Sequence, residues 1–253
     1  MSDYTRYGLV ALIVFLTHFQ DGITGFGSAA LALPFLAILI GLQLAVPALI
    51  ILGWLLSIFI ILQSRQHIVW SEYARIMVLA AIGMPIGVWI CGVLPEHSLK
   101  WVLGVFMVLI GTHGLIGQFA KGKSDGPISE RKKRWLSGFV PLGGIMQGAF
   151  GAGGPLIVIY ATRAFRDKGV FRCTLCLLWA TLNPILIATR WAAGHKLNMD
   201  VLRLVAICLP SMLLGLVLGS IAHHKADEMT FRRIVYAVLI LSGFMLIWSL
   251  LGG

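Results

Sequence analysis

Gly25-Phe26-Gly27-Ser28-Ala29-Ala30 is a cluster of small residues that interrupts an otherwise apolar stretch of the chain. A related cluster, Ala149-Phe150-Gly151-Ala152-Gly153-Gly154, follows 124 residues later. Small residues release the backbone from helical geometry and let it pass close to another backbone or to a ligand. We therefore expect a helix break at each cluster, at corresponding places in two related halves of the chain.

Two further sets of landmarks recur in the same order. Arg65 stands eleven positions after Trp54, and Arg190 stands eleven positions after Trp179. Three glycines of the first half recur at one shared offset in the second half, as the pairs Gly83 and Gly215, Gly87 and Gly219, and Gly111 and Gly243. Helix breaks at matching positions of two membrane-embedded halves point to a transporter's binding site. A general likeness among glycine-rich helices is the alternative explanation.

The composition is that of an integral membrane protein. Hydrophobic residues make up 58% of the chain and charged residues 12%, about half the charge of a soluble domain. Mean hydropathy is +0.91. Apolar stretches of about 20 residues, enough to cross a bilayer as helices, follow one another almost without pause. We expect an all-α polytopic membrane protein.

The apolar stretches fall into five segments per half. Residues 1–120 form the first predicted repeat, 121–134 a basic linker and 135–253 the second repeat. The first two segments of each half are short and flank the glycine cluster, so they are either full spans or a re-entrant pair. The predicted segments are 7–22, 26–42, 45–64, 73–93 and 98–118, then 135–150, 153–165, 171–190, 199–222 and 230–250.

An odd number of segments per repeat predicts that the two copies enter the membrane from opposite faces. If the N-terminus lies outside, fifteen Lys and Arg residues fall on the inner side and five on the outer side. Such a bias marks the cytoplasmic face. The prediction is therefore an inverted repeat with both termini outside and the 121–134 loop in the cytoplasm.

Other function classes find little support. The net charge of +10 sits at the ends of apolar runs and in one loop, which suits a lipid bilayer and not nucleic acid. Cys173 and Cys176 have a CxxC spacing but no second pair of ligands, so we expect no metal and no cofactor. No hydrolytic triad or phosphate loop is present, so we expect no enzyme. A homodimer is left open.

The breaks predict an anion site, because the half-helix after a break directs its amide N–H groups and positive dipole end at the gap. The two predicted sets are Gly25, Gly27 and Ser28, and Gly151, Gly153 and Gly154. Neighbouring donors are Gln20, Thr24, Gln147 and Asn183. Two alternatives stay open: the glycines serve close helix packing, and Asn183 only satisfies the kink at Pro184.

Charged residues near the breaks suggest roles in coupling and attraction. Asp21, whose counterpart at the offset of 124 is Ile145, is a candidate proton-coupling group with His18; the alternative places both at the water interface. Arg65 and Arg190 are candidates for attracting an anion to the transport pathway, one at each face of the membrane. The alternative is that they only extend their charges towards water at helix ends. Trp54 and Trp179 are expected to pack.

The chain resembles the sulfite exporter TauE/SafE family. The resemblance rests on Gly25-Phe26-Gly27-Ser28-Ala29 with Leu33-Pro34-Phe35, and on the second copy Gly148-Ala149-Phe150-Gly151-Ala152-Gly153-Gly154-Pro155. It covers essentially the whole chain, including the duplication and the basic linker. It implies transport of small anions such as sulfite, sulfoacetate or other organosulfur compounds across a prokaryotic plasma membrane.

These observations predict a secondary transporter that exports a small anion by alternating access around a site at the repeat interface. A passive channel for anions or small solutes is the alternative. A membrane enzyme is a third possibility, but the chain offers no nucleophile, metal cluster or redox group for it.

Overall fold

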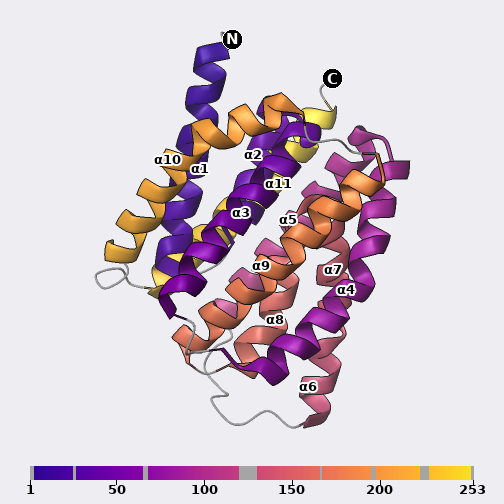
Figure 1. The fold of residues 1–253 in the computed structure, drawn as a ribbon, viewed down its shortest axis with the longest axis vertical. Helices are drawn as coiled ribbons and strands as arrows, with labels where there is room; N and C mark the ends of the chain where they lie inside the picture. The colour runs from indigo at the N-terminus through magenta and orange to yellow at the C-terminus, as the bar shows by residue number, and fades with distance from the viewer. Residues whose placement is uncertain are drawn as a thin grey trace. The chain divides into compact units, whose positions relative to one another are not determined.

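The computed structural model describes residues 3–24, 27–64, 68–119, 130–165, 167–194, 198–222 and 228–251. Every secondary-structure element within these ranges is a helix (Figure 1). The helices divide between two compact units, each made of segments that lie far apart in the sequence. Each unit is described in turn.

The first unit contains both ends of the chain. Its long helices pack in two pairs, α1 along α10 and α5 along α11, and α2 lies against α1 and α11. Figure 1 shows α1 and α10 side by side. The elements are α1 (Asp3–Thr24), α2 (Ser28–Ile40), the start of α3 (Leu42–Ser64), α5 (Glu96–Phe119), α10 (Met199–Ala222) and α11 (Glu228–Leu251).

The second unit begins within α3, at Leu49. α4 packs along α7 and also contacts α9, while α8 lies against α7 and the short α6. Its elements besides α3 are α4 (Trp70–Val93), α6 (Glu130–Ser137), α7 (Phe139–Phe150), α8 (Gly154–Ala164) and α9 (Lys168–Ala192).

The predicted fold class is confirmed. Each of the ten predicted segments corresponds to a described helix, and six of the described helices are long and apolar enough to cross a membrane. The structure adds the short helix α6, which takes in residues 130–134 of the predicted linker; residues 121–129 lie outside the described part. The repeat boundaries and the opposed orientation of the copies stay predictions.

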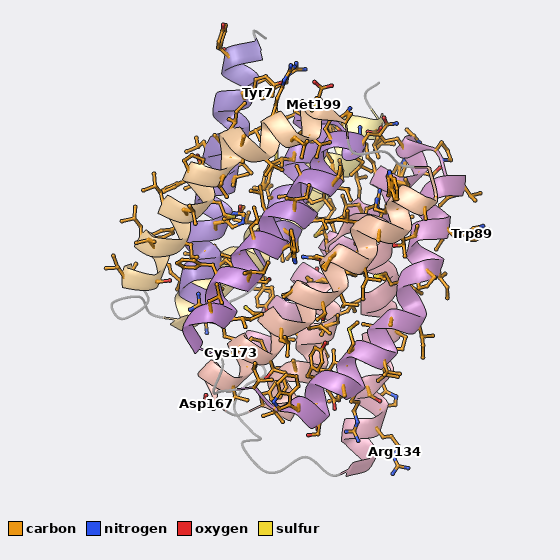
Figure 2. The ribbon with its side chains drawn as sticks, in the orientation of Figure 1. Tyr7, Trp89, Arg134, Asp167, Cys173 and Met199 are labelled. Carbon is orange, nitrogen blue, oxygen red and sulfur yellow. The ribbon has the colours of Figure 1, made fainter. Side chains whose placement is uncertain are left out.

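Large apolar side chains cover the outside of the helices. Trp89 on α4, at the edge of the view in Figure 2, is 65% exposed, and Leu109 on α5 is 64% exposed. In water this much exposed apolar surface would be unfavourable. It is the expected outer surface of a protein whose solvent is lipid, in which the backbone polar groups are satisfied inside each helix.

Glycines set how closely the long helices approach. A Cβ atom on Gly83 or Gly87 of α4 would overlap the carbonyl oxygens of Pro141 or Ile145 on α7. Their predicted counterparts in the first unit, Gly215 and Gly219 on α10, pack in the same way against carbonyl oxygens of α1. Backbone therefore packs on backbone at both crossings, as is common between membrane helices.

Under the predicted repeat, the contacts at the two crossings match particular residues of one half with those of the other. A Cβ on Gly22 would stand 2.7 Å from the carbonyl oxygen of Leu216, and one on Gly148 would overlap the carbonyl oxygen of Met84. Gly22 thus matches Gly148, an offset of 126 and not the 124 read from the sequence. The Phe-Gly pairs of the two clusters are 124 residues apart, whereas the helix ends and the backbone contacts are 126 residues apart. Asp21 therefore corresponds to Gln147, and the assignment of Ile145 as its counterpart was wrong.

Candidate functional site

The second glycine cluster ends α7 and begins α8 within the second unit. Gly151 follows the last residue of α7 with a left-handed φ of 65°, and its N–H donates to the carbonyl oxygen of Gln147 at 2.8 Å. This is a common glycine cap for a helix C-terminus. Gly153 then precedes α8, which starts at Gly154. The predicted break is present, with the N-terminal end of a half-helix directed at the gap.

A chain of amide groups crosses this break. Gly153 N–H donates to Oε1 of Gln147 at 2.9 Å, and Nε2 of Gln147 donates to Oδ1 of Asn183 on α9 at 2.8 Å. The backbone N–H can only donate, so the orientation of Gln147 is fixed, and that orientation fixes Asn183 in turn. The amide nitrogen of Asn183 is left as a donor, and among the described residues it has no hydrogen-bond partner.

A glycine lies near this donor, and an aromatic ring lies near the start of α8. Nδ2 of Asn183 lies 3.6 Å from the position that a Cβ on Gly53 of α3 would occupy. The ring of Trp179, one turn before Asn183 on α9, lies 3.8 Å from the corresponding position at Gly154. Asn183 is 4% exposed and Gln147 3%. Glycine, one aromatic ring and oriented amides are therefore neighbours at the N-terminus of α8.

The sequence left the role of Asn183 open and gave Trp179 a packing role. The structure directs the Asn183 side chain to α7, not to its own kinked helix. Trp179 packs, as expected, but it does so against the first residue of α8. The sequence analysis missed Gly53, because a single glycine in an apolar helix carries no signal of its position.

Arg190 lies at the other side of the same break. Its Nη1 donates to the carbonyl oxygens of Gly148 at 3.1 Å and Ala149 at 3.2 Å, and Nη2 lies 3.4 Å from Sγ of Cys91. Those carbonyls belong to the last turn of α7, which has no further helical turn to bond them. The buried guanidinium thus caps α7 and turns away from water. Arg65, its predicted partner, lies outside the described residues.

The first glycine cluster breaks the chain between α1 and α2 in the first unit. Gly27 precedes α2 with a φ of 101°, and the amide of Gln20 lies 3.8 Å from the position of a Cβ there. Across the gap, Oγ of Ser28 donates to Oδ2 of Asp21 at 2.6 Å. Gly25 and the side chain of Thr24 lie outside the described part of the chain.

His18 and Asp21 are both buried, at 1% and 5% exposure. Nδ1 of His18 lies 2.8 Å from the carbonyl oxygen of Val14, so this nitrogen carries the proton. Neither residue lies on the surface of the protein, and the alternative at the water interface stays open. Their coupling role stays a prediction.

The structure therefore groups the predicted residues into two sets. Gln147, Gly151, Gly153, Gly154, Asn183 and Arg190 come together in the second unit, and His18, Gln20, Asp21, Gly27 and Ser28 in the first. The prediction that both sets line one pocket stays a prediction.

One polar cluster of the second unit has no precedent in the sequence analysis. Tyr160 on α8 donates to Oε2 of Glu72 at 2.5 Å and accepts from Nη1 of Arg75 at 3.3 Å. Glu72 and Arg75 pair at 3.6 Å on the first turns of α4. These bonds hold the second half of α8 against α4. Only the i,i+3 spacing of the two charges signals it in the sequence.

Comparison with known proteins agrees with this architecture. The family model for sulfite exporter TauE/SafE matches residues 10–246. The chain is 27% identical over 242 residues to a probable sulfite/organosulfonate exporter, TauE of Cupriavidus necator, covering 92% of this chain and 90% of that protein. It is 26% identical over 186 residues to a probable inner membrane transporter protein, TsaS of Comamonas testosteroni, covering 72% and 73% respectively.

No solved structure matches the chain. The family match spans both helix breaks and overlaps every described helix that can cross a membrane, ending within α11. Its members are transporters and not enzymes, and the relatives above are described in the same terms. The chain is a multi-pass membrane transporter that belongs to the sulfite exporter TauE/SafE family.

Proposed function

We propose that the protein exports a small anion, such as sulfite, sulfoacetate or another organosulfonate, from a prokaryotic cell by gradient-driven alternating access. The name of the Cupriavidus necator relative, a probable sulfite/organosulfonate exporter, supports the direction and the sulfur oxyanion class. The break between α7 and α8 supports a negatively charged substrate. A helix N-terminus and oriented amide donors favour an anion without any positively charged side chain.

The observation that carries the proposal is the fixed orientation of the amide chain. Gly153 N–H sets Gln147, Gln147 sets Asn183, and the chain ends in an N–H₂ group with no partner among the described residues. A donor without a protein partner is free to bind an acceptor of a ligand. A bound oxyanion supplies the missing acceptor, whereas a cation at the same place would face only donors.

The test is the variant Asn183→Asp. An aspartate still accepts from Gln147 but has no N–H₂ group and adds a negative charge where the substrate would bind. Hydrogen bonds to charged groups contribute about 1.5–3 kcal/mol, so sulfite uptake into proteoliposomes should fall about 10- to 100-fold. Thermal unfolding in detergent should show that the variant is folded.

Asn198→Asp is the matched control. Asn198 is exposed and caps α10 through its Oδ1, which accepts from Val201 N–H at 2.9 Å, and an aspartate can make the same bond. Uptake by this control should equal that of the wild type. Equal uptake by both variants would contradict the assigned site.

The passive channel is separated from the transporter by two measurements on the wild type. A transporter saturates with rising sulfite concentration and accumulates sulfite against its own gradient when an ion gradient is imposed. Linear uptake without accumulation would favour the channel. The exchange of one unlabelled anion for a labelled one gives a further check, since alternating access predicts accelerated exchange.

A further inference from the structure

The two helix breaks are equivalent in position but differ in charge. The crossings of α1 with α10 and of α7 with α4 match Gly22 with Gly148, so Asp21 and Gln147 occupy the same place in their units. Both side chains lie one turn before a helix end and reach forward across the gap. One is a carboxylic acid and the other a neutral amide.

Their bonds across the gap are also alike. Oδ2 of Asp21 accepts from the side chain of Ser28, the first residue of α2, at 2.6 Å. Oε1 of Gln147 accepts from the backbone of Gly153, which immediately precedes α8, at 2.9 Å. Each oxygen therefore stands at the N-terminal end of the second half-helix, where the positive end of the helix dipole favours negative charge.

In the described part of the chain, no Lys or Arg forms an ion pair with Asp21. Its side chain is buried, and among those residues its one hydrogen-bond partner is Ser28. A buried carboxylate needs compensating donors or dipoles. The start of α2 supplies the Ser28 hydroxyl and the positive end of its helix dipole. The start of α8 would compensate the charge of a bound substrate in the same way.

We infer that the Asp21 carboxylate is a built-in anion that fills the site at the start of α2, so that the chain binds one substrate anion, at the start of α8. This inference rests on the proposed function. The second site differs by having the neutral Gln147 and the buried residue Asn183, whose amide nitrogen has no partner among the described residues. Two breaks at matching positions thereby have different roles.

The experiment that tests this inference is anion rescue of Asp21→Ala. Alanine removes the carboxylate and leaves a space that matches formate, HCOO⁻. The melting temperature of the purified variant should be lower than that of the wild type and should rise with the logarithm of formate concentration. Asp21→Asn, which fills the space with a neutral group, should show no response to formate.

Asp200→Ala is the matched control, because Asp200 is exposed at the start of α10 and its removal opens no buried space. Wild type and this control should respond to formate equally. A response of Asp21→Ala no larger than theirs would overturn the inference, and this result does not depend on the identity of the transported anion.

A measurement on the wild type keeps the inference testable if Asp21→Ala does not fold. Sulfite titrated into purified protein should saturate at one anion per chain. Two anions per chain would overturn the inference. If no sulfite binds, the proposed substrate class is wrong, and the formate response of a folded Asp21→Ala decides the role of Asp21.

Discussion

Gly151 has a backbone conformation that few other residues adopt. Its φ is 65°, and Cγ1 of Ile50 lies 2.6 Å from the place where a Cβ would stand. The left-handed conformation costs a residue with a Cβ about 1–2 kcal/mol, and here the side chain of Ile50 must also move. The turn between α7 and α8 therefore depends on glycine for both its shape and its space.

We predict that Gly151→Ala lowers both the melting temperature and sulfite uptake. Gly194→Ala is the matched control, because Gly194 has a φ of 90° but no described atom lies within 4 Å of the place where its Cβ would stand. The control carries the conformational cost alone, so its uptake should equal that of the wild type. Equal losses of uptake in the two variants would argue against a special role of the break.

Arg190 illustrates how a residue type can suggest one role and its contacts another. Its guanidinium reaches two carbonyl oxygens and a thiol at once, which the compact ammonium of a lysine cannot do. We predict that Arg190→Lys lowers the free energy of unfolding by about 1–3 kcal/mol, measured by thermal unfolding in detergent. The exposed pair of Arg203 with Asp200 supplies the control Arg203→Lys, which should have almost no effect.

The opposite pattern would contradict this account of Arg190. In that pattern, Arg190→Lys would leave the melting temperature unchanged and would only raise the sulfite concentration for half-maximal uptake. The side chain would then attract the anion to the transport pathway and would not serve to cap the C-terminal end of α7.

The broken helices depend on their neighbours for stability. α7 has 12 residues and α8 has 11, so each is about 18 Å long or less and too short to span a bilayer of about 30 Å alone. α7 gains its support from backbone contact with α4, and α8 from Tyr160, Glu72 and Arg75 at its far half. The position of the anion site therefore depends on packing some distance from it.

Gly87→Ala tests the support of α7. A Cβ at this position would overlap the carbonyl oxygen of Ile145, and neither backbone has a flexible group that can yield. Overpacking of this kind costs about 1–3 kcal/mol, so the melting temperature should fall. Gly117→Ala is the control, since none of the described atoms lies within 4 Å of a Cβ there. A wild-type melting temperature for Gly87→Ala would show that α4 and α7 are not in such close contact.

Apolar length and glycine clusters were enough to predict the helices and their breaks. The predicted segment 199–222 coincides with α10, and both clusters end a helix. The correspondence of Asp21 with Gln147 was missed, because identical letters aligned two residues away from the register that the backbone contacts require. The links of Arg190 to α7 and of Tyr160 to α4 join distant segments, and local sequence does not record which side chains meet across such distances.

At the level of the whole protein, the sequence predicts opposite membrane sides for the N-terminus and the basic linker. In a variant without native cysteines, Tyr4→Cys should react with an impermeant maleimide added outside intact cells. Arg134→Cys, an exposed position on α6 shown in Figure 2, should react only after the membrane is opened. Labelling of both from the outside would contradict the inverted arrangement.

The central claim is that a compact anion binds where α8 begins. The most direct test is a crystal structure of the protein grown with selenite, an isostere of sulfite whose selenium can be located by anomalous scattering. The account predicts one selenium peak per chain, within hydrogen-bonding reach of the Asn183 amide nitrogen and the first residues of α8. A peak at the start of α2, or selenium bound only at the exposed basic residues, would contradict it.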